Sequence, residues 1–127
     1  MIRTLLLVVL LAAPVLAGPR EGPVTDAATV KALDARDAEL FDVVFHSCDT
    51  TKLSGLIADD FEFYHDKDGL TATSGPQFIA SIVAMCARRK SGEDYGARRE
   101  VVPGSVQVFM LNNYGAVQTG QHRFYGV

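Results

Sequence analysis

Two histidines, His65 and His122, carry the chemistry that this sequence best supports. A neutral imidazole can accept a proton from a substrate near neutral pH, or it can hydrogen-bond an oxygen atom of a ligand. His65 ends a predicted strand, and Phe61 and Phe63 share its face because strand side chains alternate. We therefore expect His65 at an apolar pocket, where it is the candidate catalytic base. The alternative is a histidine that hydrogen-bonds the backbone of its own turn.

His122 lies in the last predicted strand. If that strand lies beside the hairpin of His65, both histidines line one cavity; otherwise His122 is a surface position of a sheet. Aromatic side chains would make such a cavity apolar with few polar anchors, as is typical of small-molecule sites. The predicted ligand-binding residues are Phe41, Phe61, Phe63, His65, Tyr114, His122 and Phe124. No spacing of His, Cys, Asp and Glu matches a metal-ligand motif, and we expect neither a metal nor another cofactor.

The elements that would position these residues begin with helices. Helical spacing of apolar residues predicts a long helix over residues 26–47, followed by a short helix that Asp49 caps. Side chains then alternate through residues 61–72 around a turn at residues 66–69. This pattern predicts a β-hairpin between the helices and the rest of the chain.

A second long helix is expected after the hairpin. Ser74 and Gln77 have the spacing of a capping box, and the three cations of residues 88–90 suit a helix end. The remainder is β, with turns at residues 103–104 and 112–113. The predicted strands are residues 98–102, 105–111, 114–119 and 121–127. Helices with a hairpin and then a meander predict an α+β fold, a curved antiparallel sheet packed against helices on one face.

The start of the chain has the features of a secretory signal peptide. Arg3 gives a positive start, residues 5–13 are an apolar run too short to span a bilayer, and residues 15–17 are small or apolar. We expect cleavage after residue 17, and a buried or membrane-anchoring helix is the alternative. Residues 18–25 would be a flexible leader and residues 26–127 the single folded domain. The protein is then exported, periplasmic or secreted, without membrane contact after cleavage.

The charge of the chain bears on its partners. The whole sequence of 127 residues has a formal net charge of −3, and removing Arg3 with the signal leaves −4. A mildly acidic chain lacks the basic face that nucleic acid requires. The expected partner is a small apolar or carbonyl-containing molecule, and a homodimer is also allowed.

Two cysteines, Cys48 and Cys86, are the whole cysteine content. An exported domain meets an oxidising compartment, where a pair of cysteines favours a disulfide. The closed loop of about 39 residues would stabilise the fold by about 4 kcal/mol on the chain-entropy model. Two buried free thiols, packed as small hydrophobic side chains, are the alternative.

Several motifs together resemble the nuclear transport factor 2-like superfamily, and most closely a bacterial branch of uncharacterised function. They are residues 56–61 (LIADDF), 63–66 (FYHD), 99–105 (REVVPGS), 114–117 (YGAV) and 120–124 (GQHRF). The match covers about residues 30–127. The resemblance implies a cystatin-like cone, in which a curved sheet wraps around the N-terminal helices and encloses a pocket.

The chain departs from this superfamily in two ways. The family usually continues past the position of Val127 with at least one more strand, so we expect the last strand to be lacking. In the ketosteroid isomerases of the superfamily, the carboxylate base falls at the position of His65, and the oxyanion-binding tyrosine falls near Phe41. We therefore expect an exported small-molecule-binding domain with an apolar conical pocket. The alternatives are an isomerase- or cyclase-type enzyme with His65 as base, and a dimerisation module whose open sheet forms the interface.

Overall fold

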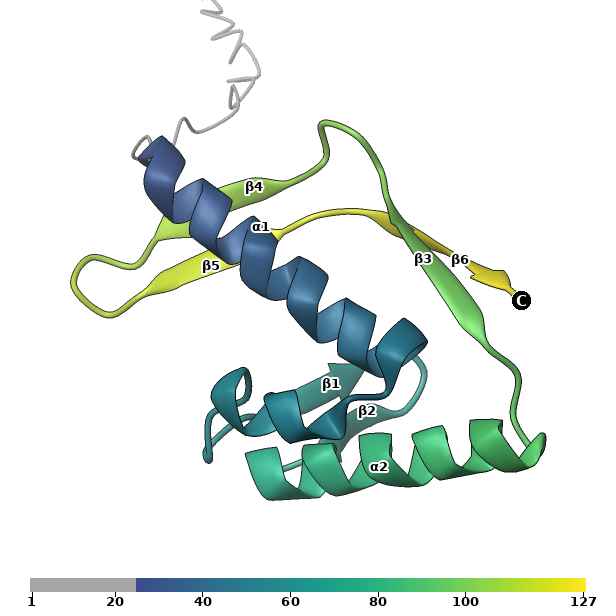
Figure 1. Ribbon diagram of the computed structural model, residues 1–127. Coiled ribbons are helices and arrows are strands. Elements are labelled where there is room, and N and C mark those ends of the chain that lie inside the picture. The colour runs from purple at the N-terminus through teal and green to yellow at the C-terminus, as the bar shows by residue number, and fades with distance from the viewer. Residues whose placement is uncertain (1–24) are drawn as a thin grey trace, which may run out of the picture.

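The computed structural model describes residues 25–127, which form helices and short antiparallel strand pairs (Figure 1). The α+β class expected from the sequence is confirmed. The predicted signal peptide, residues 1–17, and residues 18–24 of the predicted leader lie outside the described residues. Among residues 25–127, no helix combines the length and the apolar composition that crossing a bilayer requires.

The first helix, α1, spans Ala27–Asp42 and begins at Asp26, whose carboxylate accepts hydrogen bonds from the backbone N–H and the hydroxyl of Thr29. These hydrogen bonds stabilise the charged carboxylate and lower the pKa of Asp26. A π-helical turn, η1 (Val43–Ser47), continues α1 and ends at Cys48, which has a left-handed φ of 52°. The predicted helix over residues 26–47 is therefore confirmed, with a change of helix type at its end.

A short 3-10 helix, η2 (Thr50–Gly55), follows Asp49, which occupies the predicted N-cap position but makes no capping hydrogen bond through its side chain within residues 25–127. The hairpin comes next, with β1 (Phe63–His65) paired to β2 (Gly69–Ala72), and Gly69 has the positive φ, 70°, that its turn requires.

The second long helix, α2, spans Gly75–Ser91. The Ser74 hydroxyl accepts a hydrogen bond from the Gln77 backbone N–H at 3.3 Å, which is one half of the predicted capping box. The other half is displaced by one residue, because the Gln77 side-chain oxygen accepts from the backbone N–H of Thr73 at 2.8 Å. Together these bonds satisfy donors at the start of α2 and hold it against the end of the hairpin.

The last four strands are β3 (Ala97–Val101), β4 (Gln107–Met110), β5 (Ala116–Thr119) and β6 (His122–Gly126). They form one long antiparallel ribbon, in which β3 pairs with β6 and β4 pairs with β5. The predicted meander is wrong, because the chain does not reverse between β3 and β4.

A bulge explains why the ribbon continues through residues 103–104. The Val102 N–H donates to the Gln121 carbonyl oxygen at 2.8 Å, and the Ser105 hydroxyl accepts from the Gln121 N–H at 3.0 Å. The Pro103-Gly104 pair therefore forms a local turn on one strand while the opposite strand runs straight past it. The Ser105 side chain supplies the ladder hydrogen bond that the bulge would otherwise lose.

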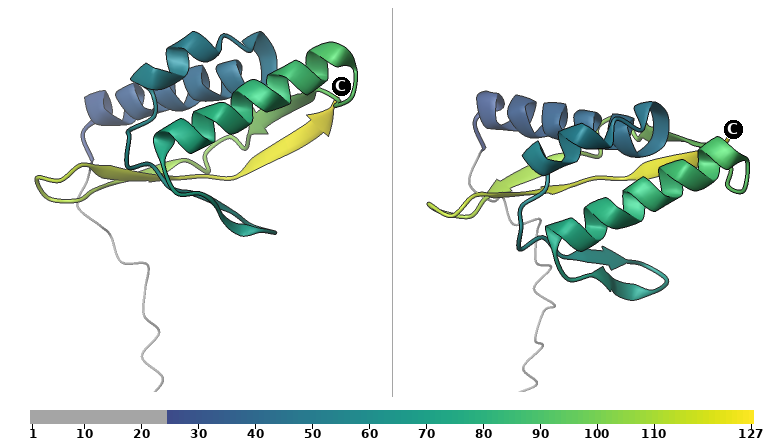
Figure 2. Two further views of the ribbon diagram at one scale, coloured as in Figure 1. Left: turned by 90° about the horizontal axis from the view of Figure 1, so that it is seen from below. Right: turned by 60° about the horizontal axis from the view of Figure 1, so that its bottom comes forward.

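The described strands make three two-stranded sheets in place of one continuous curved sheet. Figure 2 shows the β1–β2 hairpin apart from the ribbon, while α1 runs along the ribbon. The rings of Phe61 and Phe63 lie 4.9 and 5.3 Å from that of Phe78 on α2, so the hairpin packs on α2 and not on the ribbon. The buried core lies in the same half of the molecule and consists of Val43, Val44, Leu53, Ile57, Ala72, Phe78 and Ile82. The ribbon contributes no buried residue to this core.

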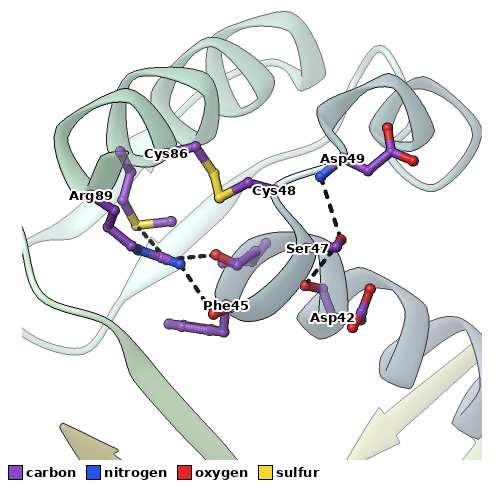
Figure 3. The surroundings of a disulfide bond; sticks show 9 residues. Asp42, Phe45, Ser47, Cys48, Asp49, Cys86 and Arg89 are labelled. Carbon is purple, nitrogen blue, oxygen red and sulfur yellow. Dashed lines mark hydrogen bonds between the residues drawn. A yellow bond between two sulfur atoms is a disulfide. The ribbon is translucent and has the colours of Figure 1, made fainter. Parts of the chain in front are cut away.

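A disulfide between Cys48 and Cys86 joins the end of η1 to α2, with the two Cα atoms 5.9 Å apart (Figure 3). The predicted bridge is confirmed, and the alternative of two free thiols is wrong. One turn after Cys86, the Arg89 guanidinium donates to the backbone carbonyl oxygens of Val44 at 2.6 Å and Phe45 at 3.2 Å. The covalent bond and this cation together fasten α2 to the carboxyl end of the first helix.

Candidate ligand-binding groove

The helix α1 lies over the ribbon (Figure 1). A groove lies between their side chains. It consists of two adjoining hollows of about 500 and 250 Å³, which share the lining residues Asp37, Phe41, Arg99, Val101 and Val106. The larger hollow extends along α1 and η1 past Asp34, Ala38, Asp42 and His46. The smaller one extends along β5 and β6, past residues 118–122. The volume of the larger hollow lies within the range of roughly 300–1,000 Å³ that is typical of small-molecule sites.

A charged side-chain cluster connects the two walls of this groove. Arg99 on β3 makes a bidentate ion pair with Asp37 on α1, with N···O distances of 2.6 and 3.1 Å. The Nε–H of Arg99 donates to Nδ1 of His122 on β6 at 3.0 Å, and the guanidinium carbon lies 3.5 Å from the centre of the Phe41 ring. We call Asp37, Arg99 and His122 the Arg99 bridge. The side chains of Arg99 and Asp37 are 13% and 28% exposed, so the pair is partly shielded from water.

The Arg99 bridge fixes the position of the proton on His122. Because a guanidinium can only donate, Nδ1 of His122 must be the unprotonated acceptor, and a neutral imidazole then carries its proton on Nε2. Within residues 25–127, Nε2 has no hydrogen-bond partner. His122 is therefore prepared to donate a hydrogen bond to an oxygen atom of a ligand.

Aromatic rings surround the bridge on the helix and on the ribbon. The Phe124 ring lies 5.1 Å from Phe45 and 4.7 Å from His122, and Phe41 lies 6.0 Å from His122. Of the seven predicted ligand-binding residues, the structure thus brings together Phe41, His122 and Phe124. The first two line the groove, and Phe124 contacts both rings from the next position on the same face of β6.

Three other predicted residues lie elsewhere. Phe61 and Phe63 pack on Phe78 beside the core, and neither lines the groove. Tyr114 is 92% exposed in the turn between β4 and β5. An aromatic residue at strand spacing can serve a core, a cavity wall or an exposed turn, and the sequence pattern alone does not separate these roles.

His65 is the last residue of β1, next to the turn of the β1–β2 hairpin. Its Nδ1 accepts a hydrogen bond from the Lys67 backbone N–H at 3.2 Å and lies 3.1 and 3.5 Å from carboxylate oxygens of Asp66 and Asp68. The side chain is 42% exposed, and it does not line the groove. The expected cavity shared with His122 required the last strand beside the hairpin, and that condition is not met, because β6 pairs with β3. The contact with Lys67 agrees with the alternative of a histidine bonded to its own turn, and a role as general base stays a prediction.

Sequence reasoning missed the two residues at the centre of the groove, Asp37 and Arg99. A signal for each was present. Asp37 lies four residues after Leu33 and four before Phe41, so a carboxylate occupies the apolar face of the helix. Arg99 lies on the side of β3 that faces α1, between two half-buried neighbours at positions 97 and 101. A charge on the inward face of a helix and another on the inward face of a strand indicate an ion pair between them.

Comparisons of the chain with protein-family models, with curated proteins and with solved structures find no match.

Proposed function

We propose that this protein is an exported domain that binds a small, largely apolar molecule carrying a carbonyl group in the groove between α1 and the ribbon. The apolar side chains of Phe41, Val101 and Val106 would contact the body of the ligand. The Nε2–H of His122 would donate to its carbonyl oxygen. The observation that carries this proposal is the hydrogen bond from Arg99, which holds His122 in the donor tautomer.

The same contacts favour binding over proton-transfer chemistry in this groove. A general base needs a free lone pair that faces the substrate. Nδ1 of His122 is occupied by Arg99. While the Arg99 bridge is intact, this nitrogen is not available to accept a proton from a ligand.

Membership of the nuclear transport factor 2-like superfamily is part of the proposal. It is supported by the order of elements, in which two helical segments precede a hairpin, a long helix and the strands. It is also supported by the bent ribbon against α1, which carries the motif of residues 99–105 at its bulge. Export is supported by the Cys48–Cys86 disulfide, because such bonds persist in oxidising compartments.

A matched pair of probes tests the proposed binding mode. 2-Acetylnaphthalene and 2-ethylnaphthalene have similar size, but only the first has a carbonyl oxygen. We expect the ketone to bind the mature protein about two- to tenfold more tightly, which is the effect of one net hydrogen bond. Dissociation constants would come from amide chemical-shift changes in NMR titrations, and residues 99–101 and 118–122 should show the largest changes.

Two variants give this experiment its controls. His122→Phe keeps an aromatic ring beside Phe41 and Phe124 but has no donor, so it should lose the preference for the ketone while still binding the hydrocarbon. His65→Phe changes a histidine outside the groove and should keep the preference. Equal affinity of the wild-type protein for the two probes, or no shift of groove amides with either, would contradict the proposal.

A further inference from the structure

We propose that the molecule bound in this groove carries a positive charge, and that the carboxylate of Asp42 contacts its ammonium group. A cationic ligand rests on the proposed function, because it presupposes the same groove, and it narrows the class of ligand. The ligand is then an amine whose apolar body also carries the carbonyl group. Its charge and its hydrogen bond to His122 are recognised by different residues, so they are tested separately.

The lining of the larger hollow is unbalanced in charge. The carboxylates of Asp34, Asp37 and Asp42 line it together with a single guanidinium, that of Arg99. Because Arg99 makes a bidentate ion pair with Asp37, these two charges neutralise each other. With His46 counted as neutral, one positive charge against three negative charges leaves a net charge of −2. A cleft lined by charges of one sign attracts ligands of the opposite sign.

The helix α1 places the two remaining carboxylates at separate points of this hollow. Asp34 and Asp42 lie eight residues apart, which corresponds to about 12 Å along the helix axis. Asp34 already accepts a hydrogen bond from Gln118 at 2.7 Å. The Asp42 carboxylate is half exposed, and the one side chain that it pairs with in residues 25–127 is His46. Their distance of 3.7 Å is too long for a hydrogen bond, so Asp42 is the carboxylate available to an ammonium group.

The cations on the neighbouring surface do not compensate for this charge. Arg36 on α1 pairs with Glu39 at 3.3 Å, outside the lining of the groove. Arg123 follows His122 directly on β6, so it projects from the opposite face of the ribbon. Among residues 25–127, no lysine lines either hollow. A positive charge beside Asp42 is therefore left for the ligand to supply.

Three ketones of similar shape test the charge of the ligand. They are 2-acetylnaphthalenes with an aminomethyl, a methyl or a carboxylate group at position 6, so the set contains a cation, a neutral molecule and an anion. At pH 8.0 an ordinary histidine is neutral, which keeps the groove in the charge state described above. In NMR titrations of the mature protein at low salt, the cation should bind about two- to fivefold more tightly than the neutral ketone. The anion should bind more weakly by a similar factor, and about 0.5 M salt should reduce both differences.

Two variants assign the effect to a residue. Asp42→Asn keeps the size of the side chain and removes its charge, so the cation should lose most of its advantage over the neutral ketone. Asp60→Asn makes the same change of net charge at an exposed position that lines neither hollow, and it should keep the wild-type preference. An equal loss of preference in both variants would refute the contact with Asp42. The order of the three ketones on the wild-type protein decides the sign of the charge even if Asp42→Asn does not fold.

The same titrations separate this charge from the proposed hydrogen bond. If the three ketones bind equally while 2-acetylnaphthalene still binds more tightly than 2-ethylnaphthalene, the cationic ligand is refuted and the proposed function stands. If the cation is preferred and Asp42→Asn removes that preference, but the ketone and the hydrocarbon bind equally, the donor role of His122 fails and the charge recognition stands. If no ketone shifts the groove amides, both are refuted.

Discussion

Replacing Cys48 and Cys86 together by alanine is expected to lower the free energy of unfolding by about 4 kcal/mol. The disulfide closes a loop of about 39 residues and thereby restricts the unfolded chain. Hydrophobic burial in the folded state can compensate little for this loss, because only Val43 and Leu53 in the core are fully buried. A loss of this size is a large fraction of the roughly 5–15 kcal/mol that stabilises an ordinary domain.

Urea unfolding, followed by circular dichroism, measures this effect. Reduction of the wild-type protein provides the control, since it removes the same bond without changing the sequence. Reductant should reproduce the loss in the wild type and leave the double variant unchanged. A double variant whose unfolding free energy agrees with that of the wild type within the roughly 10–15% error of extrapolation would show that the bridge contributes nothing.

Asp37→Ala is expected to lower the free energy of unfolding by about 2–3 kcal/mol, the cost of removing a partner from a charged hydrogen bond. The variant leaves the Arg99 guanidinium without its carboxylate, although the arginine side chain is only 13% exposed. It also removes the anion that holds Arg99 in place for its contact with His122. Stability and the ketone preference should therefore fall together in this variant.

Asp34→Ala is the matched control for that change. Asp34 lies on the same helix and lines the same groove, but among residues 25–127 its exposed carboxylate accepts only from the neutral Gln118 side chain. We expect a loss of about 1 kcal/mol or less. Thermal melts of both proteins measure the difference. Equal destabilisation by the two variants would show that the Asp37–Arg99 ion pair stabilises the fold no more than the Asp34–Gln118 hydrogen bond does.

The parts of the fold that depend on neighbouring residues could be predicted from the sequence. The start of α2 follows from the hydroxyl of Ser74 and the side chain of Gln77, and the hairpin turn follows from Gly69. The pairing of strands could not be predicted in the same way. Proline followed by glycine at positions 103–104 indicates a turn, but whether that turn reverses the chain or forms a bulge is decided by Gln121 on the opposite strand.

The candidate groove was predictable in its aromatic half only. Phe41, His122 and Phe124 were expected because aromatic and imidazole side chains suit a ligand site, and the structure brings them together. Asp37 and Arg99 were missed because charged residues are usually exposed, and an ion pair between residues 62 positions apart leaves no local pattern. An alternating pattern of aromatic residues does not distinguish a pocket wall from a core, which is why Phe61 and Phe63 were expected in the site.

The tautomer of His122 is the most direct test of the binding mode proposed for this protein. Long-range proton–nitrogen correlation spectra of the imidazole distinguish a protonated from an unprotonated nitrogen at each ring position. At pH 7.5 we expect Nδ1 of His122 to be unprotonated and Nε2 to carry the proton, with the Nε2–H signal shifting when 2-acetylnaphthalene is added. Arg99→Gln should weaken the preference for this tautomer. A proton on Nδ1 of His122 in the wild-type protein would contradict the Arg99 bridge and the donor role that rests on it.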